Sequence, residues 1–363
     1  MDKIRVLIVD DSVVIRRLLT DILNADPGIE VVGTAPNGRI ALAKLPQLNP
    51  DLVTLDIEMP EMDGLATLPE LRKVYPKLPV IMFSTLTERG ALATFDALTL
   101  GASDYVAKPA NVGSVSAGIQ SVQEQLIPKI KALAVKQQAR PAEAKPKLVA
   151  RPAALQAAAA NRPPQRFDAL IIGCSTGGPQ ALATLLRGLP ADFPLGIAVV
   201  QHMPPVFTRH LAARLDQESA LQVKEASSGD VVTPGTVLIA PGDFHLALRR
   251  QGPAVKCIIQ QEPPQNSCRP AVDVLFHSAA DVFGAGCLGV ILTGMGQDGL
   301  RGSQQIVERG GAIVAQDQPS CVVWGMPRAV VEAGLARHIV PLTSMSQELV
   351  RLAGMGRRAV AAV

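Results

Sequence analysis

The chain has 363 residues, more than one hydrophobic core usually serves, so two domains of ordinary size are expected. Its formal net charge is +3, from 35 basic and 32 acidic residues, and this near balance argues against a nucleic-acid-binding protein. No basic segment precedes a long apolar run at the start, and no stretch reaches the roughly 18 apolar residues that span a bilayer. We therefore expect a cytoplasmic protein without membrane insertion.

The hydrophobic residues make up 48% of the chain, but only 3% of the residues are aromatic. The cores must therefore be filled by Val, Ile, Leu and Ala, the composition favoured in parallel sheets that helices cover. The composition indicates an α/β protein.

The cysteines are five in number, all in the second half of the chain. They form no C-x-x-C pair and have no histidine at ligand spacing, so we expect buried free thiols rather than a zinc site or disulfides. They are Cys174, Cys257, Cys268, Cys287 and Cys321.

The first part of the chain, over residues 4–110, alternates short β-rich runs with helical patterns. Five such units predict a doubly wound parallel sheet, and we assign residues 1–135 to this domain. The predicted strands are IRVLIV, VVGTA, DLVTL, PVIMF and DYVA.

The segment 136–166 is rich in Ala, Pro, Lys and Gln, and it cannot bury enough apolar surface to order itself. We interpret it as a linker. A flexible chain of this length reaches on the order of 30 Å, so it would let the flanking domains touch or separate.

The remainder, residues 167–355, resumes the alternation of strands and helices, and several of its strands end in Gly, Asp, Ser or His. In an open α/β sheet the ligand crevice lies beyond the carboxyl ends of the strands, so polar residues there are candidates for chemistry. The predicted strands are DALIIG, LGIAVVQ, TVLIAPG, VKCIIQ, CLGVILTG and AIVAQD.

Acidic residues close two predicted strands of the first domain. Asp10 and Asp11 follow the first strand, Asp56 ends the third, and Lys108 follows the fifth. Three carboxylates that converge at one sheet edge would repel one another unless a hard divalent cation such as Mg²⁺ lay among them. The alternative is that the Asp-Asp-Ser run only caps the following helix.

This pattern resembles the receiver domain of two-component response regulators, over residues 3–125, and implies a flavodoxin-like fold. The resemblance implies that Asp56 accepts a phosphoryl group from a histidine kinase. It also implies Mg²⁺ bound by Asp11, Asp56 and the backbone carbonyl of Glu58, with Asp10 assisting through water.

The same resemblance assigns three switch residues. Lys108 would pair with the phosphoryl group, Ser84 matches the hydroxyl that moves toward it, and Tyr105 matches the aromatic side chain that changes rotamer. An aspartyl phosphate adds charge and acceptor atoms, which can shift a nearby two-state surface.

The second domain opens with a G-x-S-x-G pattern at Gly173, Ser175 and Gly177. Small neighbours of the serine permit a sharp strand-to-helix turn that projects a nucleophile at the edge of the sheet. A glycine-rich turn of this kind equally suits a phosphate at a helix N-terminus, so the loop alone leaves a nucleotide site open.

Two distant segments favour the nucleophile. His202 follows a strand in AVVQHMPP, and Asp298 lies in the glycine-rich loop after another strand, with Asp317 as its chief rival. Ser175, His202 and Asp298 would then be the nucleophile, the base and the carboxylate that orients the base. Their order along the chain differs from the Ser, Asp, His order of α/β-hydrolases, so that fold is not expected.

Residues 167 to about 345 resemble the catalytic domain of the chemotaxis protein-glutamate methylesterases. The motifs that carry this resemblance are GCSTGGPQAL, VVQHMP, IAPGDFHL, RPAVDVLFHSAA, GVILTGMGQDG and AQDQPSCVVWGMPRAV. It implies a Rossmann-like serine hydrolase that removes methyl esters from glutamates of methyl-accepting chemoreceptors, releases methanol and deamidates receptor glutamines. No cofactor is implied for this reaction.

The resemblance also implies that the backbone N–H groups of Thr176 and Met295 stabilise the oxyanion. Cys268 stands where many relatives have His, and Trp324 where Phe is frequent, which leaves the receptor-contact surface near Cys268 open. The rival function is a response regulator with a nucleotide-binding output domain, but no G-K-[ST] follows the glycine-rich loop, as a phosphate-binding P-loop would require.

Overall fold

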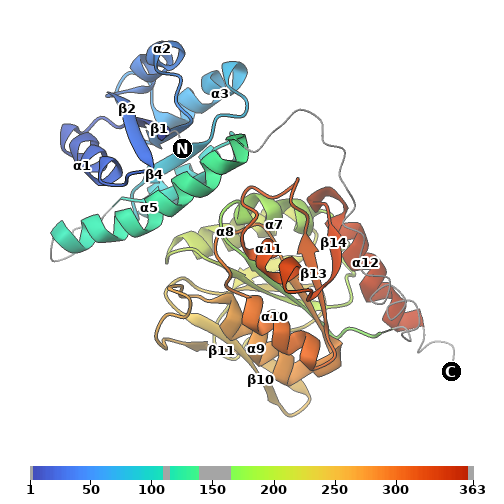
Figure 1. Cartoon of the computed structure of the whole chain (residues 1–363). Coiled ribbons are helices and arrows are strands. Elements are labelled where there is room, and N and C mark those ends of the chain that lie inside the picture. Colours follow the sequence, from blue (N-terminus) through green and yellow to red (C-terminus); the bar gives the residue numbers. More distant parts are fainter. Residues whose placement is uncertain (1–2, 109–114, 139–164, 359–363) are drawn as a thin grey trace. The chain divides into compact units, whose positions relative to one another are not determined.

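The computed structural model describes residues 3–108, 115–138 and 165–358. It divides into two compact units, residues 1–138 and 139–363, each of which is described by itself (Figure 1). Most of the predicted linker lies outside the described residues. Its first three residues, 136–138, belong to the last turn of a helix, because that helix continues to Gln138, beyond the predicted domain boundary.

The first unit is a parallel sheet in the order β2-β1-β3-β4-β5. This order is that of the flavodoxin-like fold, in which the ligand site lies where β1 and β3 diverge. The strands are β1 (Ile4–Val9), β2 (Ile29–Ala35), β3 (Leu52–Asp56), β4 (Val80–Ser84) and β5 (Asp104–Ala107). The helices are α1 (Val13–Asn24), α2 (Gly38–Leu48), α3 (Gly64–Val74), α4 (Glu88–Thr99) and α5 (Val115–Gln138).

Polar side chains begin the first four helices of this unit where the sequence leaves its strands. The Ser12 hydroxyl accepts a hydrogen bond from the Ile15 amide at 3.4 Å and caps α1. Side-chain oxygens of Asn37, Asp63 and Thr87 cap α2, α3 and α4 in the same way. The capping role considered for the Asp-Asp-Ser run therefore falls to its serine, which leaves the two aspartates for other contacts.

The second unit is a seven-stranded parallel sheet in the order β14-β13-β12-β6-β7-β9-β8. Helices cover both of its faces, with α9 packed on α10 and α7 packed on α8 and α12. The strands are β6 (Ala169–Cys174), β7 (Gly196–Gln201), β8 (Gln222–Glu225), β9 (Thr236–Ile239), β12 (Cys287–Ile291), β13 (Ala312–Gln316) and β14 (Ala336–Val340). The helices are α7 (Gly178–Arg187), α8 (Phe207–Glu218), α9 (Val272–Phe283), α10 (Leu300–Glu308), α11 (Met326–Glu332) and α12 (Leu342–Arg358).

One predicted strand, VKCIIQ, does not join the parallel sheet. It forms β11 (Ala254–Gln260), which pairs antiparallel with β10 (His245–Gln251) as a separate hairpin. Only two residues, at positions 252–253, separate the strands, and a connection this short can join only antiparallel neighbours. A parallel arrangement would need a crossover of a dozen or more residues.

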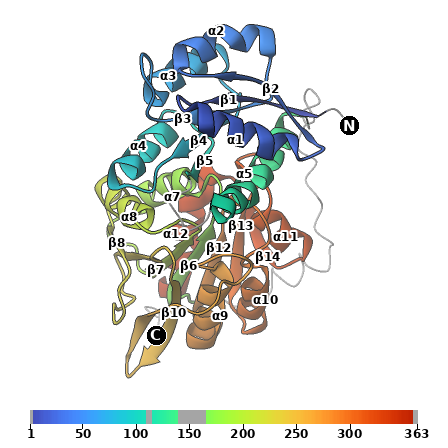
Figure 2. The same cartoon turned by 90° about the vertical axis from the view of Figure 1, so that its left-hand side faces the viewer.

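Three neighbouring strands at the centre of the large sheet bring the candidate residues of the second unit together. Figure 2 shows β12, β6 and β7 side by side, and all three run parallel. Their carboxyl ends therefore lie at one edge, where the segments carrying Ser175, His202 and Asp298 emerge. Within the described part of the chain, no helix is both long enough and apolar enough to cross a bilayer.

Candidate functional site

The acidic residues of the first unit meet at the carboxyl ends of β1 and β3. Ligand oxygens of Asp10, Asp11 and Asp56 lie within 4.8 Å of one another. Asp10 and Asp56 are buried and Asp11 is exposed. The Lys108 ammonium lies 2.7 Å from Oδ2 of Asp56 and 3.0 Å from Oδ2 of Asp10, so one cation serves two buried carboxylates.

Burial raises the pKa of Asp56 to about 6, although Lys108 acts in the opposite direction. Oδ1 of Asp56 accepts a hydrogen bond from the Ile57 amide at 2.8 Å. In the described residues, Oδ2 of Asp56 has no partner besides Lys108. Buried carboxylate oxygens with so few donors fit a hard cation such as Mg²⁺, which takes carboxylate and water ligands.

The predicted switch residues lie on β4, on β5 and directly after β5. The Ser84 hydroxyl is buried and donates a hydrogen bond to the Gly90 carbonyl at 3.1 Å, so it is joined to α4. The Tyr105 side chain is also buried, and burial raises the pKa of its phenol well above the ordinary value. The exposed Glu58 carboxylate pairs with Arg89 at 3.4 Å.

In the second unit, Ser175 lies in the tight turn between β6 and α7. Its amide donates a hydrogen bond to the Thr293 carbonyl at 3.0 Å, which ties the turn to the loop after β12. Gly177 has φ +77°, and a Cβ there would lie 2.5 Å from Val322, so only glycine fits. A Cβ on Gly294 would lie 3.0 Å from Cβ of Ser175, which shows how closely the β12 loop approaches the serine.

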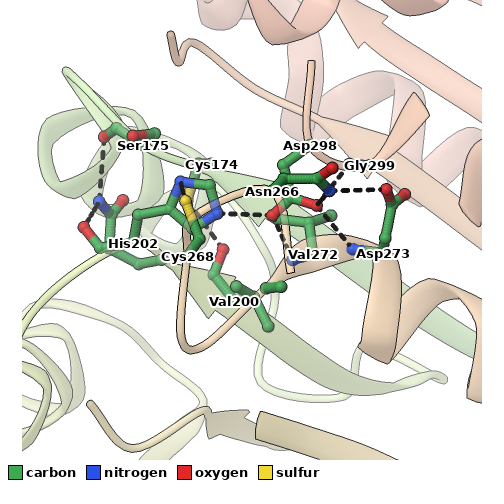
Figure 3. A network of polar contacts seen from close by, with 12 residues as sticks. Cys174, Ser175, Val200, His202, Asn266, Cys268, Val272, Asp273, Asp298 and Gly299 are labelled. Atoms are coloured by element: carbon green, nitrogen blue, oxygen red, sulfur yellow. Dashed lines mark hydrogen bonds and ion pairs between the residues drawn. The ribbon is translucent and has the colours of Figure 1, made fainter. Parts of the chain in front are cut away.

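His202 and Asp298 form a direct pair, with Nε2 of His202 2.7 Å from Oδ2 of Asp298. Asp298 is buried, and its carboxylate accepts four further hydrogen bonds (Figure 3). An ionised carboxylate only accepts, so the proton between the two groups belongs to Nε2. The four further donors are the amides of Val272, Asp273 and Gly299 and the Asn266 side chain, at 2.6, 3.1, 3.0 and 2.7 Å.

The two partners shift each other's proton affinity. Burial opposes a charge on His202, but hydrogen bonds with Asp298 and Cys268 outweigh it and raise the pKa of the imidazole to about 10. Burial also opposes the charge on Asp298, yet His202 and the backbone donors lower its pKa below the ordinary value. The pair therefore stabilises the imidazolium that forms when the neutral ring of His202 removes a proton from a nucleophile.

The second nitrogen of His202 points away from Asp298. Nδ1 lies 3.6 Å from Sγ of Cys268. In the described residues, no hydrogen bond joins the Ser175 hydroxyl to His202, although the His202 amide donates to the Cys174 carbonyl at 3.1 Å beside it. Catalytic hydrogen bonds are often long before substrate binds. The lack of a hydrogen bond between Ser175 and His202 in the described residues is therefore compatible with His202 as the base.

Two residues were predicted to bind the oxyanion. Thr176 follows the serine directly, and Met295 lies in the loop after β12. Thr176 is buried, and its carbonyl accepts a hydrogen bond from the Thr293 hydroxyl at 2.9 Å. Met295 follows Gly294, which contacts Ser175, and it is half-buried. Both backbones therefore lie beside the serine turn.

The rival carboxylate and the other histidines lie elsewhere. Asp317 accepts hydrogen bonds from the amide and the hydroxyl of Ser320 and so stabilises a turn. His245 is buried, and its ring is held by the Ala271 amide and the Pro263 carbonyl. Of the candidate base–carboxylate pairs that the sequence offered, only His202 and Asp298 are in contact in the described residues.

The sequence reasoning did not single out Asn266 or Asp273. The Asn266 amide bridges two carboxylates, at 2.7 Å from Oδ1 of Asp298 and 2.9 Å from Oδ2 of Asp273. Four of the five cysteines are free and buried as expected, but Cys268 is half-buried and contacts His202. Cys268 and His202 are 66 positions apart, so no local spacing could reveal this contact.

Comparison with known proteins finds a matching family for each of the two units. A family model described as CheB methylesterase matches residues 170–349, and one described as response regulator receiver domain matches residues 6–120. The protein-glutamate methylesterase/protein-glutamine glutaminase of Nocardioides sp. is 55% identical over 97% of this chain and 96% of its own length. The protein of the same name from Trichodesmium erythraeum is 51% identical over 98% of this chain and 100% of its own length.

A solved structure extends the likeness to the fold of the second unit. The crystal structure of the Thermotoga maritima CheB methylesterase catalytic domain is 45% identical, with a TM-score of 0.51. The match covers 51% of this chain and 98% of that one. Since the sequence identity extends along nearly the full length of the relatives, the chain belongs to the CheB methylesterase family, with a receiver domain ahead of the esterase domain.

Proposed function

We propose that Ser175, His202 and Asp298 catalyse the methylesterase and glutaminase reactions of this chemotaxis response regulator. The proposed substrates are glutamate methyl esters and glutamine amides on methyl-accepting chemoreceptors. The names of the relatives support the two reactions, on glutamate esters and glutamine amides of proteins. The observation that carries the assignment of residues is the His202–Asp298 pair at the sheet edge from which Ser175 emerges.

The reaction begins with attack of the Ser175 hydroxyl oxygen on the ester carbonyl, while Nδ1 of His202 accepts the hydroxyl proton. The backbone N–H groups of Thr176 and Met295 stabilise the negative oxygen of the tetrahedral intermediate, a contribution of roughly 3 to 4 kcal/mol for each donor. The imidazolium then returns the proton to the leaving oxygen, and methanol departs. Water repeats the cycle on the acyl-enzyme and releases the glutamate carboxylate and free Ser175.

The orientation of the imidazole follows from its contact with Asp298. Because Nε2 donates to that carboxylate, Nδ1 of the neutral ring carries the lone pair and is the atom available as a base. Amides pass through the same kind of tetrahedral intermediate, with ammonia leaving in place of methanol. The same residues therefore serve the glutaminase reaction.

In the receiver domain, Asp56 is the proposed phosphoryl acceptor and a histidine kinase the proposed phosphodonor. Asp10, Asp11, Asp56 and the Glu58 carbonyl would hold Mg²⁺, which offsets negative charge around the transferred group. Lys108, already paired with Asp56, would bind the new phosphoryl oxygens. Ser84 and Tyr105 would respond to the phosphoryl group and alter the surface formed with α4.

We further propose that the unphosphorylated receiver restrains the esterase and that phosphorylation releases it, in the cytoplasm. The linker would allow the receiver to dock on the esterase domain and to separate from it. The coupling between phosphorylation and esterase activity equals the difference in docking free energy between the unphosphorylated and the phosphorylated receiver. Acetyl phosphate with Mg²⁺ should raise methanol release from methylated receptor. A chain lacking residues 1–140 should match or exceed that rate, and a truncated chain no faster than the unphosphorylated whole would contradict restraint.

The nucleophile is tested by Ser175→Ala in the methanol-release assay with methylated receptor. We expect activity to fall to the uncatalysed background, because the proposed acyl-enzyme forms on the Ser175 hydroxyl oxygen. Ser303→Ala changes a buried serine of α10 and serves as the control. Substantial activity in Ser175→Ala would refute the assignment.

A further inference from the structure

The contact between His202 and Cys268 joins two ligand atoms that favour borderline-soft metal ions. Sγ of Cys268 lies 3.6 Å from Nδ1 of His202, on the side of the ring that Asp298 does not occupy (Figure 3). The described residues include all five cysteines, and Cys268 is the one whose side chain is not buried. A thiolate and a neutral imidazole are the ligands that zinc takes most often in proteins.

The separation of the two atoms suits one metal ion. Zinc lies about 2.3 Å from a cysteine sulfur and about 2.0 Å from a histidine nitrogen, so tetrahedral ligands of these two kinds stand roughly 3.6 Å apart. Nε2 donates to Asp298, which leaves the lone pair of the neutral ring on Nδ1. A histidine that binds zinc commonly donates its other nitrogen to a carboxylate in this way.

Both ligand atoms are held in place by one network. Gln265 and Cys268 exchange backbone hydrogen bonds of 3.1 and 2.8 Å across a tight turn. The two central residues of that turn have φ of 52° and 61°, as a type I′ turn requires. The first of them, Asn266, donates to the same Asp298 carboxylate that orients His202.

We propose that His202 Nδ1 and Cys268 Sγ form a binding site for Zn²⁺, with water in the remaining positions. As zinc binds, the thiol proton passes to solvent, and so does the Nδ1 proton of the imidazolium, because both ligand atoms must be deprotonated. Zinc and the serine proton would compete for the same lone pair of Nδ1. Bound zinc therefore inhibits the esterase, a consequence that rests on the role proposed above for His202, whereas the binding itself does not.

Binding is tested with Co²⁺, which occupies zinc sites and gives a thiolate-to-cobalt charge-transfer band. The titration uses the whole chain with excess Mg²⁺, so that the acidic pocket of the receiver is filled and only thiolate binding is seen. We expect the band in the wild type and in Ser267→Ala, and its loss in Cys268→Ser and in His202→Ala. Absence of the band from the wild type, or its survival in folded Cys268→Ser, overturns the site.

Inhibition is tested by measuring methanol release in the presence of ZnCl₂. Zinc should inhibit the wild type reversibly, with activity restored by a chelator followed by Mg²⁺. Cys268→Ser should need at least about tenfold more zinc for the same fractional inhibition, since loss of even an indirect metal contact costs that much. Equal sensitivity in Cys268→Ser would overturn the proposal.

The two measurements separate the metal site from the catalytic assignment. A cobalt band that depends on both residues, together with a wild-type rate that zinc does not change, would leave the site standing and refute competition at Nδ1. Loss of activity in Ser175→Ala without any cobalt band would retain the proposed function and reject the site. Circular dichroism of each variant establishes that it is folded.

Discussion

Asp56 and Asp298 occupy similar places in the two domains, yet their surroundings differ. Asp56 ends β3 and Asp298 lies in the loop after β12, both inner strands of their sheets, and each side chain is 3% exposed. Asp298 accepts five hydrogen bonds, from three amides, the Asn266 side chain and His202. Asp56 accepts one from an amide and shares the Lys108 ammonium with Asp10.

The number of donors, rather than burial, separates the two carboxylates. Burial raises the pKa of Asp56 to about 6, whereas the donors around Asp298 overcome burial and lower its pKa. A carboxylate whose oxygens are all occupied can orient an imidazole but has little capacity for a new bond. One with unoccupied oxygen lone pairs suits a cation or a phosphoryl group.

The largest expected effect comes from removing the charge of Asp298. Asp298→Asn should lower kcat for methanol release by about 10³- to 10⁴-fold, because the amide no longer fixes the protonated nitrogen of His202. Asp317→Asn changes the rival aspartate, which holds only a turn, and should retain most of the activity. Equal losses in the two variants would remove the distinction drawn for Asp298.

A smaller effect is expected on stability from Asp56. Its folded-state pKa of about 6 exceeds the ordinary 3.8, so the ionised side chain destabilises the folded receiver increasingly as pH rises through that interval. Asp56→Asn should therefore stabilise the metal-free receiver by about 2 kcal/mol at pH 7. Each unit by which the pKa is raised corresponds to about 1.4 kcal/mol, and partial screening by solvent reduces the total. The advantage should vanish below about pH 3, where Asp56 is protonated in both states.

Urea unfolding at both pH values measures this difference. Asp11→Asn is the matched control, because Asp11 lies in the same pocket but is exposed. If Asp56→Asn destabilises the receiver at pH 7, the account of Asp56 as a carboxylate short of donors is wrong.

The smallest effect concerns Asn266, whose amide joins Asp298 to Asp273. Asn266→Ala should lower kcat about tenfold, which corresponds to the lower end of the free energy of a hydrogen bond to a charged group. The loss stays small because Asn266 is exposed, so water can replace its amide. KM should change little, since Asn266 acts through Asp298. Ser267→Ala, in the same turn, is the control, and an unchanged kcat in Asn266→Ala would show that the other donors suffice.

Much of the fold follows from local patterns in the sequence. Short runs rich in Val, Ile and Leu, separated by helical periodicities, predicted parallel α/β sheets, and the sheets and the comparisons confirm this class. The hairpin of β10 and β11 was missed as a separate sheet, because an apolar run does not tell which partner it pairs with. The helix α5 continues to Gln138, past the domain boundary drawn at residue 135 from the change in composition.

The sequence by itself determined which residue types follow which strands, and so it offered Ser175, His202 and Asp298 as candidates. Only the tertiary structure decided that β12, β6 and β7 are neighbours, that Asp298 rather than Asp317 contacts His202, and that Cys268 contacts the same ring. Strand patterns are local, with a period of two residues, whereas strand order and contacts across 66 or 96 positions depend on how the whole sheet packs.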